Sequence, residues 1–274
     1  MFAYDFEYDG LYLSDFGFTI CSFDSESGTN TVSAGSSITF NKISRNKGKS
    51  NILIGSKYDE CIKTTFNICK TNCNDDNENM IITTDEFRDI MRWLNRPEFH
   101  RFQIIDNSEK FREPCYFNAS FNIEKIFVAD ELYGLRLTME TDKPFGYGET
   151  QTVTKNITYD NNKLKIYDIS DEIGETYVDI NILCKSDSDI SIANENIKNN
   201  TMTIKNCKNG ELIHIDGRNL VITSNKIEHD ICSDFNYEFL KIRNTYNTRL
   251  NNIAVNTLCK ITIEYIPIIK NIPN

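Results

Sequence analysis

The chain contains 274 residues, 39% of them hydrophobic, and its 40 acidic and 30 basic side chains give a formal net charge of −10 at pH 7. This length fits one large β domain or two of ordinary size, and the acidic balance excludes nucleic acid and anionic membrane surfaces as expected partners, because both repel it. The nine cysteines form no CxxC pair, which argues against a disulfide framework. No run of roughly 18 to 20 apolar residues is present, which argues against a membrane span. Because the sequence also shows no signal-peptide pattern, we expect synthesis in a reducing cytoplasm.

Short strands are predicted at the amino terminus, where FAYDFEYDGLYLSDFGFTICSF mixes aromatic and aliphatic residues with the turn residues Asp9-Gly10 and Gly17. Residues 27–58 then contain no acidic side chain, and their lysines and arginine give a local charge of +5. Charge runs of this kind usually form a solvated loop or hairpin. The alternative is a contact surface for an acidic partner or a neighbouring subunit.

One amphipathic helix is predicted near residues 84–95, within IITTDEFRDIMRWLNRPEF. Thr83 and Glu86 have the spacing of a capping box, and Pro97 ends the helix. Trp93 lies beside the apolar stripe and is expected in the core rather than at an interface. The stripe follows the i, i+3, i+4, i+7 spacing at Phe87, Ile90, Met91 and Leu94.

A long hairpin follows the helix. Its first strand alternates apolar and polar residues from Phe117 to Glu124, its turn is expected at Asp130-Glu131, and its second strand alternates from Leu135 to Met139. The cluster Pro144–Gly148 then stops the strand, because proline cannot continue a ladder and glycine permits a sharp redirection. This stop predicts a boundary between a first domain at 1–148 and a second at 149–274.

A second alternating series begins beyond the boundary, in YVDINILCK, DISI, TMTIKN, GELIHIDGRNLVITSN and CKITIEYIP. Turn signals recur about every ten residues, as in a β-sandwich. Asp216-Gly217 predicts a short-loop hairpin within it. The fold class is therefore mainly β: an amino-terminal β domain with one short helix, then a β-sandwich from about Gln151 to the end.

No motif in the sequence predicts chemistry. His100, His214 and His229 lie far apart, and Cys69 and Cys73 lack the spacing of a redox pair, so no metal site is expected. The acidic run NCNDDNENMIIT lacks the glycine and glutamate of a calcium loop. No GxSxG elbow, P-loop or dinucleotide fingerprint is present, and 40 acidic residues select no carboxylate pair. We therefore expect no catalytic, metal or cofactor-binding residues, and no enzyme.

The order of these elements resembles the distal tail protein family of bacteriophages and phage-tail-like particles. The resemblance covers nearly the whole chain. Its most specific parts are the strand and its proline-aromatic stop at residues 135–147, GELIHID at 210–216, and NYEFLKIRNTYN followed by CKITIEYIP. None of them is a catalytic motif, so the match is one of architecture.

The resemblance implies a structural virion protein that forms a hexameric ring at the distal end of the tail and joins the tail tube to the hub or receptor-binding apparatus. It implies that the first domain makes the ring and that the second is a galectin-like β-sandwich. The implied partners are further copies of the chain, the tail tube protein and the tail hub or a tail-associated protein. The implied location is the virion tail, after synthesis in the host bacterial cytoplasm.

Within such a ring, each subunit uses two different patches, which favours charge asymmetry. The candidate residues for the positive side are Lys42, Arg45, Lys47 and Lys49. Two other functions stay open. One is a carbohydrate-binding receptor-recognition module of a tail tip, although Trp93, the single tryptophan, lies outside the sandwich. The other is a hydrolase, which would require turnover of a cell-wall glycan that is lost on changing one carboxylate.

Overall fold

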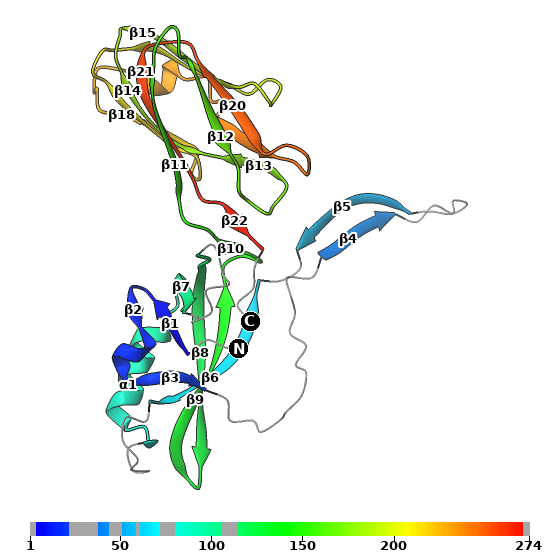
Figure 1. Ribbon diagram of the computed structural model, residues 1–274, viewed down its shortest axis with the longest axis vertical. Coiled ribbons are helices and arrows are strands. Elements are labelled where there is room, and N and C mark those ends of the chain that lie inside the picture. Colours follow the sequence, from blue (N-terminus) through cyan, green and yellow to red (C-terminus); the bar gives the residue numbers. More distant parts are fainter. Residues whose placement is uncertain are drawn as a thin grey trace. The chain divides into compact units, whose positions relative to one another are not determined.

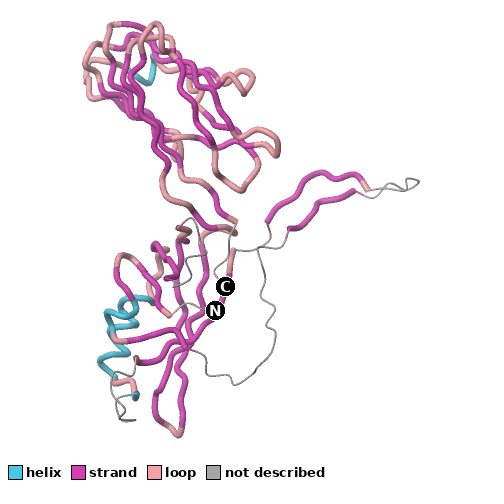
Figure 2. Tube along the Cα trace, in the orientation of Figure 1, coloured by secondary structure: helices cyan, strands magenta, loops and turns pink. Residues whose placement is uncertain are grey.

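The computed structural model describes residues 4–21, 38–43, 51–58, 61–71, 80–105 and 114–270 (Figure 1). Strands dominate the described chain and its helices are short (Figure 2), which confirms the predicted mainly β fold. Two compact units divide the chain. The first is Met1–Gly148 together with the chain end from Ile269, and the second is Glu149–Ile268. Within the described ranges, no helix has the length and apolar character needed to cross a membrane.

The first unit is built on a seven-stranded sheet in the order β2-β1-β7-β8-β9-β6-β3. Every pairing in it is antiparallel. A 3-10 helix, η1 (Leu13–Phe16), connects β2 to β3. The strands are β1 (Asp5–Tyr8), β2 (Leu11–Tyr12), β3 (Phe18–Cys21), β6 (Lys63–Lys70), β7 (His100–Ile105), β8 (Phe117–Val128) and β9 (Glu131–Thr141).

Helix α1 (Thr84–Leu94) begins at the predicted capping box. The Glu86 N–H donates to Thr83 Oγ1 at 3.3 Å, and the Thr83 N–H donates to a Glu86 carboxylate oxygen at 2.8 Å. Trp93 is buried, and its Nε1–H donates to the Tyr8 carbonyl oxygen at 2.9 Å. The prediction that Trp93 belongs to the core is confirmed.

Aromatic rings fill the core between α1 and the sheet. Phe6 lies among four of them, with ring centroids between 5.4 and 6.0 Å from those of Phe66, Trp93, Phe102 and Phe121. Aromatic pairs at this spacing add stabilisation beyond the area they bury. The core of the first unit is therefore held by interlocking rings contributed by both strands and helix.

The hairpin of β8 and β9 has the predicted alternation. Phe121 on β8 and Leu137 on β9 are buried with their apolar neighbours, while the polar residues between them face outward. Ala129 and Asp130 form the turn, both with positive φ, at 49° and 67°. Asp130 tolerates this backbone conformation better than most residues, which suits it to a tight connection.

Beyond β9, the chain forms the short strand β10 (Gly146–Tyr147), which pairs with β22 (Ile268–Ile269). Gly146 has no room for a side chain, because an added Cβ would lie 2.4 Å from Cys115 Sγ. Glycine at the strand stop is thus required by close packing within the first unit. The second unit ends at Ile268, whereas the sequence predicted a second domain running to residue 274.

The second unit is a β-sandwich of a five-stranded sheet, β11-β21-β14-β17-β18, and a four-stranded sheet, β12-β20-β15-β16. A further pair, β13-β19, and a short helix, α2 (Ile231–Asp234), accompany them. The strands are β11 (Gln151–Ile157), β12 (Lys163–Tyr167), β13 (Gly174–Tyr177), β14 (Asp179–Cys184), β15 (Ser188–Asn194), β16 (Thr201–Cys207), β17 (Leu212–Asp216), β18 (Val221–Ser224), β19 (Lys241–Asn244), β20 (Leu250–Val255) and β21 (Cys259–Tyr265).

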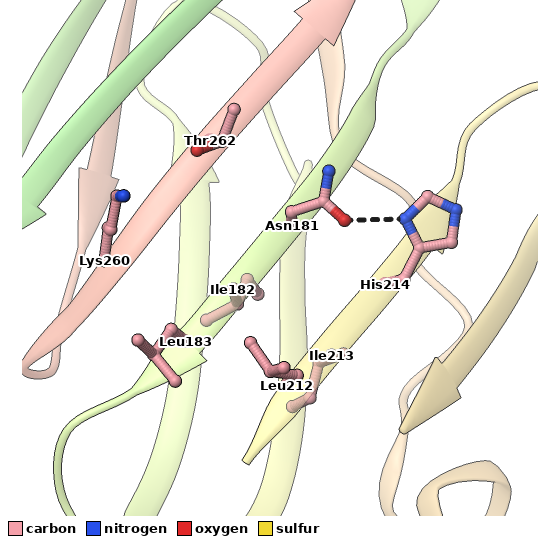
Figure 3. Close-up of a pocket in the computed structure, with 8 residues that line it drawn as sticks. All are labelled: Asn181, Ile182, Leu183, Leu212, Ile213, His214, Lys260 and Thr262. Atoms are coloured by element: carbon pink, nitrogen blue, oxygen red, sulfur yellow. Dashed lines mark hydrogen bonds between the residues drawn. The ribbon is translucent and has the colours of Figure 1, made fainter. Parts of the chain in front are cut away.

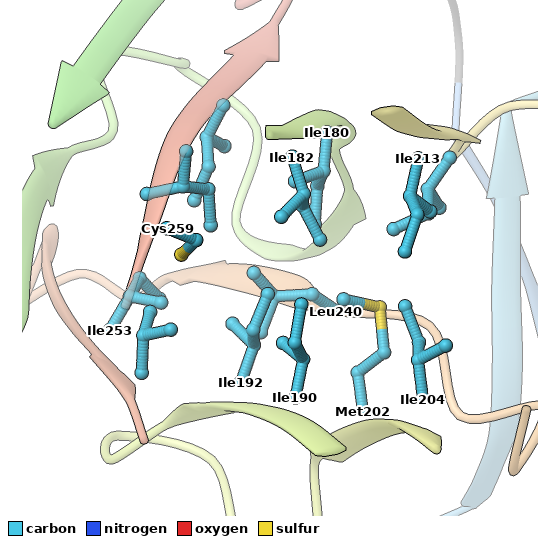
Figure 4. Packing of buried hydrophobic residues seen from close by; sticks show 14 of the residues in the cluster. Ile180, Ile182, Ile190, Ile192, Met202, Ile204, Ile213, Leu240, Ile253 and Cys259 are labelled. Atoms are coloured by element: carbon cyan, nitrogen blue, oxygen red, sulfur yellow. The ribbon is translucent and has the colours of Figure 1, made fainter. Parts of the chain in front are cut away.

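Isoleucine dominates the sandwich core, in contrast to the rings of the first unit (Figure 4). Ile180 and Ile182 from one sheet face Ile190 and Ile192 from the other, and all four are buried. β17 and β18 form the predicted hairpin across Asp216-Gly217. β-Branched side chains fit a pleated surface well, so this composition suits two sheets packed face to face.

Candidate assembly surface

The strands β4 (Ile38–Ile43) and β5 (Ile52–Tyr58) form a two-stranded sheet of their own. We call it the β4–β5 hairpin. Ile38 pairs with Tyr58 and Phe40 with Ser56, and the register shifts between Asn41 and Lys42. Within the described residues, no strand of the seven-stranded sheet pairs with either edge. An isolated two-stranded hairpin is at best marginally stable in water, so this one needs a partner that covers it.

Apolar side chains on the β4–β5 hairpin face solvent. A surface strand normally alternates polar with apolar residues and buries the apolar face. Here neither face is covered by a described element. Six large apolar side chains are between 43% and 63% exposed, namely Ile38, Phe40, Ile43, Ile52, Leu53 and Ile54. Contiguous exposed apolar residues on a soluble protein mark an interaction site.

Lys42 is the one predicted interface residue within the described chain. It lies on β4 and is exposed, with Nζ 5.4 Å from the centroid of the Phe40 ring. Arg45, Lys47 and Lys49 lie outside the described residues. The positive charge at Lys42 therefore sits within an apolar strand, so apolar and cationic groups share the same surface. The sequence prediction named the cations, and the exposed apolar side chains lie on the two strands of the hairpin.

The base of the β4–β5 hairpin contacts the strand stop of the first unit. The ring centroids of Tyr58 and Phe145 are 6.3 Å apart in an edge-to-face arrangement, and Lys270 Nζ lies 5.7 Å from the Tyr58 ring. Both contacts are made by Tyr58, which pairs with Ile38 at the open end of the hairpin. The hairpin is thus attached at its base, and its apolar residues beyond the base have no cover among the described residues.

Exposed apolar side chains also lie at the tip of the β8–β9 hairpin. Phe127 and Val128 are both more than half exposed, next to the turn at Ala129 and Asp130. The register shifts beside Phe127, which bends the tip of β8. The first unit therefore presents exposed apolar side chains at this tip as well as on the β4–β5 hairpin.

The second unit presents an open depression of about 300 Å³ on the outer face of its five-stranded sheet (Figure 3). Asn181, Lys260 and Thr262 contribute polar groups to it, and His214 Nδ1 lies 2.8 Å from Asn181 Oδ1. Leu212 lines the same depression. None of the side chains lining it is Trp, Tyr or Phe, so it lacks the large aromatic rings on which sugars commonly stack.

The three histidines remain apart from one another and pair with carboxylates or amides. Only His229 is fully buried beside a carboxylate: its Nδ1 lies 2.6 Å from Glu211 Oε1. Burial acts to raise the pKa of Glu211, but hydrogen bonds from Ser224, His229 and the Lys208 backbone outweigh burial and leave that pKa below its ordinary value. The side chains of Glu211 and His229 are almost wholly inaccessible, so this contact connects two loops inside the second unit and is closed to a substrate.

Two family models match the chain. One, described as a phage tail protein N-terminal domain, matches residues 1–143, and the other, described as a phage tail C-terminal domain, matches residues 145–265. Among solved structures, the chain is similar to the Dit protein of phage SPP1, presented as a paradigm of hub adsorption apparatus in phages that infect Gram-positive bacteria. The TM-score is 0.65 at 10% identity, over 96% of this chain and 98% of that one, so the two share a fold. No curated protein matches the chain.

Proposed function

Because the chain belongs to the phage tail protein family that these two models describe, we propose that it forms a ring of six copies at the distal end of a tail. The ring joins the tail tube to the tail-tip hub or receptor-binding apparatus. It is a structural component of the virion, or of a phage-tail-like particle, made in the cytoplasm of the bacterial host. The proposal assigns it no catalysis and no cofactor.

The observation that carries this proposal is the uncovered β4–β5 hairpin. Burying an apolar side chain of this size stabilises an assembly by about 1.5 to 3 kcal/mol when burial is complete. A neighbouring copy in a closed ring supplies a cover to every hairpin at once, because each subunit offers one patch and receives a different one. The fold shared with SPP1 Dit supports the tail-tip location of this ring.

Charge has a smaller part in the proposed interface. Lys42, Arg45, Lys47 and Lys49 would meet acidic groups of the next copy, and exposed ion pairs contribute only about 0 to 1 kcal/mol each. Their main effect is on the orientation and rate of association, which weakens as salt is added. Apolar burial through the first unit therefore holds the ring, and charge guides it.

The ring is tested by measuring the mass of the purified full chain by multi-angle light scattering over a range of concentration and salt. We expect the mass of six copies for the parent protein and a shift to monomer for the double variant Leu53→Ser/Ile54→Ser. Ile227→Ser is the matched control, since Ile227 is fully exposed but lies in the second unit. A parent protein that is monomeric in every condition would contradict the ring.

We also propose that the two units fold as separate domains, so that a fragment spanning residues 149–268 is stable alone. Each unit has its own buried cluster, which is what an independently folding domain requires. Circular dichroism and a cooperative thermal transition of the fragment test this. An unfolded fragment would show that the sandwich depends on the rest of the chain.

A further inference from the structure

Two thiols and a carboxylate come together inside the β-sandwich. One ligand atom from each of Cys184, Cys207 and Glu211 lies within 4.8 Å of the other two. All three residues are at most 1% exposed. They belong to a part of the molecule that the proposed ring does not use, and no sequence motif pointed to them.

The chain brings the three residues together through a tight turn and a neighbouring strand. Cys207 ends β16, and the turn that follows is closed by the Glu211 N–H, which donates to the Lys208 carbonyl oxygen at 3.0 Å. Gly210 in this turn has a φ of 78° and donates its N–H to the Cys184 carbonyl oxygen at 2.9 Å. The Cys184 N–H in turn donates to the Glu211 carbonyl oxygen at 2.9 Å.

The result is a local pair of donors, Cys207 and Glu211, separated by three residues, with a third donor supplied by the end of β14. Structural zinc sites commonly take two ligands from a turn with two to four residues between them. A search for paired cysteines or histidines misses this turn because its second donor is a carboxylate. The remaining donor, Cys184, is distant in sequence.

Glu211 is already oriented by its neighbours and keeps one acceptor position. Ser224 Oγ donates to its Oε1 at 2.5 Å and His229 Nδ1 lies 2.6 Å from the same oxygen, while the Lys208 N–H donates to Oε2 at 2.8 Å. A carboxylate has about four acceptor positions. Three hydrogen bonds therefore hold the group in place and leave about one lone pair for a further partner, as the ligands of metal sites are held.

We propose that Cys184, Cys207 and Glu211 bind a zinc ion that joins the two sheets of the sandwich. Two thiolates and a carboxylate suit Zn²⁺, whose bonds are about 2.3 Å to sulfur and about 2.0 to 2.2 Å to oxygen. On binding, both S–H bonds break, their protons leave to solvent, and two Zn–S bonds form with no electron transferred. The three residues leave the fourth position of a tetrahedral site to a water molecule or another ligand.

A disulfide between Cys184 and Cys207 is the competing use of the same two sulfurs. Both cysteines are free thiols in the structure. A chain made in a reducing cytoplasm keeps its thiols reduced, and in that setting clustered cysteines more often bind metal. A disulfide also makes no use of the Glu211 acceptor position. Zinc uses all three groups.

Elemental analysis of the full chain, purified with a thiol reductant from cells grown with zinc, tests the proposal directly. We expect about one zinc per chain. Replacement by Co²⁺ without oxygen should produce a sulfur-to-cobalt charge-transfer band in the near ultraviolet. Absence of both bound zinc and this band in the parent protein overturns the site, whatever the variants do.

Variants then identify the ligands. Cys207→Ser and Glu211→Gln should lose most of the bound metal, whereas Cys232→Ser should retain it, because Cys232 is an exposed thiol of the same unit. Metal retained in Cys207→Ser, or a disulfide between Cys184 and Cys207 found by peptide mapping of protein purified with its thiols alkylated, overturns the proposal. This test is independent of the proposed ring. A zinc-free hexamer would refute only the zinc site, and a monomer that contains zinc would refute only the ring.

Discussion

The β4–β5 hairpin and the β-sandwich place the same residue type in opposite surroundings. Ile54 on the hairpin is 63% exposed, whereas Ile182 on β14 is 1% exposed. Both lie in short strands with β-branched residues, and only the sandwich has a second sheet that covers them. Apolar residues in a strand therefore mark a surface that needs a cover. The cover comes from the same chain in one case and, by our proposal, from another copy in the other.

The largest expected contrast is in the stability of the subunit. Ile182→Ala should lower the free energy of unfolding of the second unit by about 2 to 5 kcal/mol, because it leaves a cavity between two packed sheets. Ile54→Ala should change the stability of the monomer by no more than about 0.5 kcal/mol, as at other surface positions. Chemical denaturation followed by circular dichroism measures both. Equal losses in the two variants would mean that the hairpin is covered within the monomer.

Two glycines sharpen the same contrast at the backbone. A Cβ on Gly217 would lie 2.4 Å from the Val178 carbonyl oxygen, so Gly217→Ala should cost about 1 to 3 kcal/mol through overpacking. A Cβ on Gly55 would meet no atom within 4 Å, so Gly55→Ala should leave the stability unchanged or raise it by up to about 1 kcal/mol. The melting temperatures of the two variants, compared with that of the parent protein, measure this contrast. A melting temperature for Gly217→Ala equal to that of the parent would show that the backbone around residue 217 shifts to accommodate the added methyl group.

An exposed polar group stabilises the fold where hydrogen bonds hold it, as at the start of α1. Thr83→Ala should cost about 1 kcal/mol at neutral pH by removing the cap. Glu86, the other half of the capping box, also pairs with Lys70 Nζ at 2.8 Å. The loss of unfolding free energy caused by Thr83→Ala should be smaller when it is measured at about pH 3, because carboxylates in unfolded chains are largely protonated there. A cost that does not depend on pH would assign the effect to the neutral hydrogen bond from the Glu86 N–H to Thr83 Oγ1, without a part for the Glu86 carboxylate.

The sign of this pH dependence follows from Glu86. Burial acts to raise its pKa, but the Lys70 side chain and the Thr83 backbone and hydroxyl groups outweigh burial and hold the pKa below its ordinary value. The contribution of Glu86 is therefore fully present above the unfolded-state value of about 4.3. It is lost as the pH falls through the lower folded-state pKa. Glu86→Gln should remove this part of the acid sensitivity of the first unit.

The smallest expected effect belongs to the cation on the hairpin. Lys42→Glu should leave the monomer folded and weaken the ring by about 0 to 1 kcal/mol per interface, with the difference fading at high salt. Light scattering at low and high ionic strength measures it, and Lys57→Glu on β5 is a second exposed position for comparison. An effect as large as that of Leu53→Ser/Ile54→Ser would reverse the order of apolar and charged contributions proposed here.

Local patterns in the sequence were sufficient for several elements. The capping box at Thr83 set the start of α1, the polar turn at Asp130 set the β8–β9 connection, and Asp216-Gly217 set the β17–β18 hairpin. Each depends on groups a few residues apart, so their geometry follows from the backbone itself. The resemblance of the whole chain to a phage tail family also came from the sequence, and the family models confirm it.

The tertiary structure decided what strand patterns leave open. Alternation says that one face of a strand is apolar, but not which strand or subunit covers it, so the exposure of Ile54 and the burial of Ile182 could not be told apart. Nor could spacing show that Cys184 meets Cys207 and Glu211, because the contact joins a turn to a strand of the opposite sheet. Local periodicity is set by backbone geometry, whereas partners distant in sequence are chosen by the packing of the whole sheet.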